Sequence, residues 1–307
     1  MFSGLRSNSP HSTKHLQYKP MYVHLTTHSA YSLQEGLATP AELVQAAKAQ
    51  GMPALGLTDH LLLTGTVEFV QACQEADIQP ILGLEVSVDT RRLSLLATSQ
   101  EGWANLCRLS SALALQGELE PVQIWGLLAR YANDLVALSD HHGKNAGKRL
   151  ETLKDIFADR LYLTLQDPSI GLPVSHFARS MGISMVVTHP VYYLRPEQAA
   201  LQRTLTAVRL NQTLNTLSPD EAASEGTYFL SQGEILRRFH GFKSALKRTM
   251  EVAERCKFDL PLGVPNMPKI PISNGLGASQ YLRQKAEAGA RRRYGKITPE
   301  IQARLDH

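Results

Sequence analysis

Cysteine, long apolar runs and a secretion signal are scarce or missing in this chain of 307 residues. The three cysteines, Cys73, Cys107 and Cys256, are far apart and form no CxxC pair, which excludes a disulfide scaffold and favours a reduced compartment. Each is expected to be a small buried apolar residue. No apolar run reaches the roughly 18 residues of a membrane span, and residues 1–20 lack the apolar segment of a secretory signal. The sequence predicts a soluble, cytoplasmic protein without a membrane partner.

The charge of the chain is mildly basic and unevenly distributed. A formal net charge of +4 and a pI near 8.9 permit contact with nucleic acid without requiring it. Between Tyr281 and Lys296 the chain has six basic residues against one acidic residue, Glu287. A basic helix in this place can contact DNA phosphates, or it can be a solvated face that packs against other parts of a larger protein. The candidates for DNA contact are Arg283, Lys285, Arg291, Arg292 and Arg293.

The block from Tyr22 to Val88 sets the pattern for the first two thirds of the chain. Short apolar runs, typical of strands, alternate with helical patterns. The first helix is predicted to begin at Thr39, because Thr39, Pro40 and Glu42 have the spacing of a capping box. Continued alternation predicts an α/β fold throughout this part. The predicted strands are 22–25, 54–57, 81–86, 92–98, 135–139, 161–166 and 183–188.

Beyond Pro196 the sequence predicts helices alone. The stretch 260–275 is rich in Pro and Gly and is expected to be an extended connection. A helix opened by Thr298 is cut off at His307, which suggests a fragment of a longer protein. The predicted parts are a disordered extension (1–20), an α/β barrel (21–196), a helical segment that completes or flanks the barrel (197–258), and a linker with the truncated start of a further region (259–307).

Side chains that bind metals occur at the predicted strand ends. His28 follows the first strand, Asp59 and His60 follow the second, and Glu85 lies within the third. Since the carboxyl ends of parallel strands converge on one mouth of a barrel, these groups could share a ligand. The alternative is that His28 and His60 are hydrogen-bonded histidines of the core or the mouth. Asp59 could equally cap a backbone amide after its strand.

Several stretches carry a resemblance to a known family. HLTTHSAYSLQEG, GMPALGLTDH, GTVEF and IQPILGLEV resemble the PHP domain (polymerase and histidinol phosphatase) at the start of bacterial DNA polymerase III alpha subunits. The resemblance continues in the same order through MVVTHPVYYL, AERCKFDLPLG and YLRQKAEAGARRRYGK. It implies an α/β fold, a distorted (βα)7-type PHP barrel, followed by a small all-helical segment that leads into a polymerase region. Such barrels hold up to three divalent metals for phosphoester hydrolysis.

The resemblance also allows the family's metal ligands to be compared position by position. Four positions keep a metal-binding side chain, namely His28, His60, Glu85 and His141. Four have lost theirs, namely Thr26, Pro168, Pro190 and Tyr192. His189 is one residue from a lost position and so is expected to face the other side of its strand. Because metal hydrolysis needs at least three protein ligands per ion, we expect no cofactor, the alternative being a divalent metal (Zn, Mn or Mg) on the four that remain.

The implied function is that of the amino-terminal part of a DNA polymerase III alpha subunit, with a degenerate PHP domain as scaffold and docking surface in DNA replication. The chain has no D-x-D pair and so lacks the paired carboxylates of nucleotidyl transfer. The alternative is a residual metal-dependent 3′–5′ exonuclease or phosphoesterase. A free-standing histidinol-phosphatase-like enzyme would have no use for the polymerase-like tail. The implied partners are the remainder of the polymerase chain, other holoenzyme subunits including a proofreading exonuclease, and DNA.

Overall fold

A computed structural model describes residues 21–116, 121–218, 221–265, 267, 271–272 and 275–307. The extension predicted at 1–20 and parts of the connection predicted at 260–275 lie outside these residues. The chain divides into two compact units, Met1–Leu260 and Pro261–His307. Among the helices described, none is long and apolar enough to cross a membrane.

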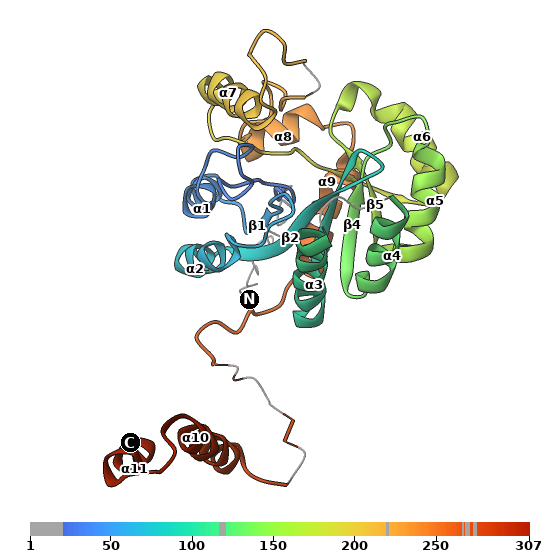
Figure 1. The fold of residues 1–307 in the computed structure, drawn as a ribbon. Helices are drawn as coiled ribbons and strands as arrows, with labels where there is room; N and C mark the ends of the chain where they lie inside the picture. Colours follow the sequence, from blue (N-terminus) through green and yellow to red (C-terminus); the bar gives the residue numbers. More distant parts are fainter. Residues whose placement is uncertain (1–20, 117–120, 219–220, 266, 268–270, 273–274) are drawn as a thin grey trace, which may run out of the picture. The chain divides into compact units, whose positions relative to one another are not determined.

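The first unit is built on a curled, half-barrel sheet of six strands in the order β1-β2-β3-β4-β5-β6 (Figure 1). β1 and β2 are parallel, and so are β4, β5 and β6. Most strand residues are buried whichever face they point to, as expected for a sheet covered on both sides. The strands are β1 (Ala54–Leu57), β2 (Gln79–Val88), β3 (Arg91–Ala97), β4 (Leu135–Ser139), β5 (Leu161–Leu165) and β6 (Ser184–Val187).

Strand β3 departs from the regular alternation of strands and helices. Asp89 and Thr90, with φ of 48° and 64°, form a two-residue turn that folds β3 back along β2. Two consecutive helices, α3 (Gln100–Gln116) and α4 (Pro121–Tyr131), then lead to β4, which is antiparallel to β3. The predicted α/β class is therefore confirmed, and so are the two successive strands predicted at 81–86 and 92–98, although their antiparallel pairing was not predicted.

The helices of the first unit largely follow the predicted pattern. The sequence predicts only a helix end near Ile156 for α5, and it predicts a helix over 197–214, of which α7 forms the part that ends at Arg209. Apart from α9 (Lys243–Arg255), these helices are distributed around the sheet (Figure 1). Besides α3 and α4 they are α1 (Pro40–Ala49), α2 (Thr66–Ala76), α5 (Ala146–Phe157), α6 (Gly171–Met181), α7 (Ala199–Arg209), α8 (Gln232–Arg238) and α9 (Lys243–Arg255).

The predicted capping box at the start of α1 is confirmed. Thr39 Oγ1 accepts a hydrogen bond from Glu42 N at 3.2 Å, and Thr39 N donates to Glu42 Oε2 at 2.9 Å. We expect Thr39→Ala to lower the free energy of unfolding by about 1 kcal/mol, as measured by urea denaturation. Thr152→Ala is the control, because the exposed Thr152 hydroxyl bonds only to Lys148 O within α5. Equal stabilities of the two variants would contradict the capping role.

The segment predicted as the first strand, Tyr22–Leu25, is not a regular strand, but its continuation lies between the two ends of the sheet. On one side Gly56 N donates to His24 O at 2.8 Å and Thr58 N to Thr27 O at 2.8 Å. On the other side His28 N donates to Val191 O at 2.8 Å. These bonds place the segment and the residues that follow it next to β1, and His28 next to the chain that follows β6.

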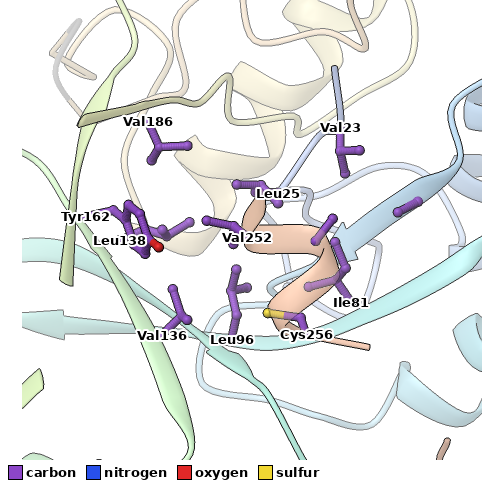
Figure 2. Close-up of a cluster of buried hydrophobic side chains, with 12 residues drawn as sticks. Val23, Leu25, Ile81, Leu96, Val136, Leu138, Tyr162, Val186, Val252 and Cys256 are labelled. Carbon is purple, nitrogen blue, oxygen red and sulfur yellow. The ribbon is translucent and has the colours of Figure 1, made fainter. Parts of the chain in front are cut away.

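The core of the first unit lies on the inner side of the curled sheet, around α9. Figure 2 shows Val252 and Cys256 among buried side chains from the strands. Thr249, also on α9, accepts a hydrogen bond from Val23 N at 3.3 Å. Burial raises the pKa of the Cys256 thiol to about 12, which keeps it protonated and apolar in character. The other strand side chains in this cluster include Ile81, Leu96, Val136, Leu138 and Val186.

The second unit contains a pair of helices, α10 (Ala278–Tyr294) and α11 (Pro299–Asp306). Arg283 on α10 connects them: its Nε lies 2.6 Å from Glu287 Oε1, and its Nη1 lies 2.6 Å from Asp306 Oδ1 and donates to Leu305 O at 3.2 Å. The Arg283 side chain is therefore bonded to groups of both helices.

Candidate functional site

Three of the candidate ligands lie near one another at the carboxyl ends of the first strands. An isolated bridge pairs His60, just beyond β1, with Glu85 in β2. His28, which follows the Tyr22–Leu25 segment, brings its Nε2 within 3.2 Å of Glu85 Oε1. The fold thus places His28, His60 and Glu85 in one region, as their spacing predicts.

Both carboxylate oxygens of Asp59 accept hydrogen bonds from the loop that follows the Tyr22–Leu25 segment. Its Oδ1 accepts hydrogen bonds from Ser29 N and Ser32 Oγ, and its Oδ2 accepts one from Ser29 Oγ, each at 2.7 Å. This buried carboxylate therefore holds the loop against the end of β1, as a capping group rather than an open ligand.

Arg92 of β3 lies at the centre of the site, bonded to two carboxylates. Its Nη1 donates to Glu85 Oε1 at 2.7 Å, and its Nη2 donates to Glu35 Oε2 at 3.1 Å. Arg92 pairs across the sheet with Ser87, so it lies diagonally opposite Glu85 on the same face. A planar guanidinium suits this bridging position, because its N–H groups point toward both acids.

Glu35 collects the remaining cationic groups of the site. His60 Nδ1 lies 3.1 Å from Glu35 Oε1, and Arg209 Nη1 of α7 lies 3.6 Å from the same oxygen. Burial raises the pKa of Glu35, but the hydrogen bond from His60 and the charge of Arg92 lower it further, to about 2. Glu35 is only 4% exposed, and it stays ionised in this buried position because of these partners.

His28 is fully buried and is held from two sides. Its ring stacks on Tyr192 with a centroid distance of 4.3 Å and an interplanar angle of 7°. Its Nδ1 lies 3.3 Å from Val191 O, while Nε2 faces Glu85. Burial lowers the pKa of His28, but Glu85 raises it more, so the net shift is upward. Burial raises the pKa of Glu85, and His28 and Arg92 bring it below its ordinary value. The charged pair is the favoured form.

His141 belongs to a different set of contacts. It follows β4 beside Asp140, whose Oδ1 accepts from Arg149 Nη2 at 2.8 Å and whose Oδ2 accepts from Arg91 Nε at 3.1 Å. The His141 ring packs on His142 with centroids 4.0 Å apart. Within the described part of the chain, no three His, Cys, Asp or Glu side chains are arranged so that they could hold a metal ion.

The four positions without a metal-binding side chain hold a threonine, a tyrosine and two prolines. Thr26 is buried, and Tyr192 covers the ring of His28. Pro168 begins a short 3₁₀ turn after β5, and Pro190 follows His189 beyond β6. His189 places its Nε2 2.9 Å from Tyr228 O, so that nitrogen donates to a carbonyl instead of facing the mouth.

The sequence analysis missed Glu35, Arg92 and Arg209. Glu35 belongs to the loop that Asp59 organises, and the sequence of this loop does not indicate that the Glu35 side chain is buried. Arg92 reaches Glu85 only because the Asp89–Thr90 turn sets the register of β3 against β2. A hairpin signal at Asp89–Thr90 was the one available clue.

In the second unit, the five basic candidates differ in their contacts. Arg283 is tied to Glu287 and Asp306, and Lys285 lies 5.3 Å from the centroid of the Tyr281 ring. Arg291 lies 4.0 Å from Glu287. Neither Arg292 nor Arg293 has an ion-pair partner among the residues the structure describes, and both line a hollow of about 620 Å³ with Tyr294 and Leu305.

Residues 24–168, which contain the loop around Asp59 and the strand-end residues His28, His60 and Glu85, match the family model described as "PHP domain". A solved amidohydrolase structure from Chromobacterium violaceum, with bound sulfate and no metal, superimposes with a TM-score of 0.38 and 18% identity over 56% of this chain and 87% of that one.

More particularly, the chain corresponds to the amino-terminal region of bacterial DNA polymerase III alpha subunits and error-prone DNA polymerases. It is 30% identical to the error-prone DNA polymerase of Symbiobacterium thermophilum, over 93% of this chain and 30% of that protein. It is also 30% identical to the DNA polymerase III subunit alpha of Halalkalibacterium halodurans, over 89% of this chain and 26% of that protein. The chain thus spans less than a third of the length of these relatives.

Proposed function

We propose that this chain forms the amino-terminal region of a polymerase III alpha-type DNA polymerase. We further propose that its PHP domain is a distorted (βα)7-type barrel, in which the segment Tyr22–Leu25 joins the six-stranded sheet, and that it serves as a scaffold and not as a phosphoesterase. The single observation that carries the proposal is the guanidinium of Arg92. It lies bonded to Glu85, the one carboxylate among the remaining ligand positions, and to Glu35 beside it. A resident cation thus neutralises both carboxylates without any metal.

The histidines support the same conclusion. His60 Nδ1 is engaged by Glu35, and His28 is held in an ion pair with Glu85 that raises its pKa. A metal-ligating histidine must offer a free ring nitrogen lone pair, whereas a ring nitrogen of each of these histidines faces a carboxylate, Glu85 for His28 and Glu35 for His60. The residues present therefore do not fit a divalent metal.

The relatives suggest the context in which such a scaffold works. Because the chain aligns with only the first part of polymerases, we infer that the remainder of a polymerase chain and other replication subunits, including a proofreading exonuclease, are its partners. Arg292 and Arg293 are the basic residues of α10 best placed to contact DNA phosphates, since Arg283 is already used within the helix pair.

The proposal predicts that the purified chain neither binds nor uses divalent metals. With millimolar Mn²⁺, Zn²⁺ or Mg²⁺, the melting temperature should change by less than about 1 °C, because a ligand that binds only the folded state would raise it. No metal-dependent release of nucleotides from a labelled single strand, or of phosphate from p-nitrophenyl phosphate, is expected.

The competing function is a residual exonuclease or phosphoesterase that uses His28, His60, Glu85 and His141. It would be established by hydrolysis that EDTA removes and that His60→Ala abolishes. His176→Ala is the matched control, because His176 is an exposed histidine of α6 outside the contacts of this site. Activity that depends on His60 and not on His176 would overturn the scaffold proposal.

A further inference from the structure

A hollow of the first unit lies at the amino-terminal end of β6, whereas the histidines of the site follow the carboxyl ends of the strands. Its volume is about 660 Å³, and it is formed by the carboxyl-terminal half of α6, the beginning of β6 and the beginning of α9. Ser184 at the first position of β6 lines it, whereas His189 lies beyond the last position of the same strand. We call it the α9 hollow. It lies within the first unit alone.

The charge of the α9 hollow is positive and uncompensated. Arg179 of α6 and Lys243 and Arg248 of α9 line it together with His240, and no Asp or Glu occurs among its described lining residues. In the part of the chain that the structure describes, the side chains of Arg179 and Lys243 have no ion-pair partner, and Arg248 gives one hydrogen bond, from Nη1 to Met185 O at 2.9 Å. Cations that converge on one hollow without acids attract an anion.

The backbone adds to this field. α9 is 13 residues long, and its first turn, Lys243 to Ala245, lines the hollow. The amino end of a helix carries a partial positive charge and N–H groups without helical acceptors. The preceding residue, Phe242, has no oxygen in its side chain to accept from them and makes no side-chain cap bond. A phosphate oxygen at this point would meet backbone donors as well as the side chains.

We propose that the α9 hollow binds a phosphate group, carried either by a free nucleotide or by a DNA end. The size is that of sites which take small ligands, and Phe242, Ile183 and Met185 supply apolar wall beside the basic groups. Ser175, Ser184 and Ser244 provide neutral hydroxyl donors. This site is separate from the region of Arg92 and does not depend on whether the PHP domain hydrolyses anything.

The test uses the whole chain and measures fluorescence anisotropy with two probes, a fluorescent dATP and a labelled single strand with a 5′-phosphate. We expect binding of at least one probe, weakened by rising salt, and weakened about tenfold or more in the double variant Arg179→Ala, Lys243→Ala. Both side chains are exposed, so the variant should keep the melting temperature of the wild type. Binding of dATP alone identifies a nucleotide as the source, and binding of the strand alone identifies a DNA end.

Two control variants separate this site from other basic surfaces. Lys247→Ala changes an exposed lysine of α9 that pairs with Glu251 and does not line the hollow, so binding should be unchanged. The double variant Arg292→Ala, Arg293→Ala removes the candidate DNA contacts of the second unit. If neither probe binds, or if binding is lost only in the α10 variant, the α9 hollow is not a phosphate site. Both of these outcomes would leave the proposed function untouched, because the binding assay does not measure metal-dependent hydrolysis.

Discussion

Replacing Arg92 by Ala should destabilise the first unit by about 2 to 4 kcal/mol at neutral pH, because removal of one partner leaves buried charges unpaired. Glu35 and Glu85 are 4% and 5% exposed, and both depend on the guanidinium. The Arg92 side chain itself is 36% exposed, so water can partly replace it and the loss stays below that of a fully buried pair. Urea denaturation followed by circular dichroism measures the change.

The effect of Arg92→Ala should depend on pH in a defined direction. In the wild type, burial raises the pKa of Glu35, but His60 and Arg92 lower it from 4.5 to about 2. This carboxylate therefore stabilises the fold above pH 4.5, and its contribution is lost as the pH falls through 2. In Arg92→Ala, which lacks the guanidinium, burial favours the neutral form of Glu35 more than it does in the wild type. The stability gap between variant and wild type should thus be largest near about pH 7 and should shrink toward acid pH.

Arg108→Ala is the matched control for Arg92→Ala. Arg108 Nη1 lies 2.6 Å from Glu101 Oε1, but the two side chains are 49% and 61% exposed. Such a surface pair contributes about 0 to 1 kcal/mol, with little change between neutral and acid pH. Equal effects of the two substitutions would show that Arg92 is only a surface cation, and the argument against a metal would lose its basis.

Which residues come together at the site could be predicted only in part. The approach of His28, His60 and Glu85 followed from strand ends alone, since parallel strands bring their carboxyl ends to one edge. The partners of these residues could not be predicted, because Arg92 depends on the register of a hairpin and Arg209 comes from a helix more than a hundred residues further along. Long-range register is not encoded in any local pattern.

The fold shows the same division between local and long-range information. The capping box at Thr39 and the strand β4 are local patterns and were predictable. The antiparallel direction of β3 was not recognised, because Asp89–Thr90 is a less obvious turn than Asn-Gly or Asp-Gly. The place of α9 inside the curl of the sheet depends on contacts with Val23 and Gln79, far away in sequence. An amphipathic pattern marks a buried face without naming what covers it.

Gly56→Ala should strongly destabilise the first unit, because an added methyl group would force the strand β1 away from the segment that positions His28. A Cβ at Gly56 would lie 2.3 Å from Leu25 O, 2.7 Å from Leu25 C and 3.0 Å from Leu25 Cα. These are backbone atoms and cannot turn aside as a flexible side chain could. The hydrogen bond from Gly56 N to His24 O, at 2.8 Å, would be strained with them. We expect a loss of about 3 kcal/mol, or a fall in melting temperature of about 6 to 12 °C.

Gly126→Ala separates this steric effect from the general cost of changing glycine. Gly126 lies inside α4, and an added Cβ meets nothing within 4 Å, so alanine should raise stability by about 0.5 to 1 kcal/mol through its higher helix propensity. The two substitutions add the same atom and should act with opposite sign. A Gly56→Ala variant as stable as the wild type would contradict the close approach of β1 to the segment before His28, which the 2.8 Å hydrogen bond from Gly56 N to His24 O defines. The ion pair of His28 with Glu85 would then need another means of support.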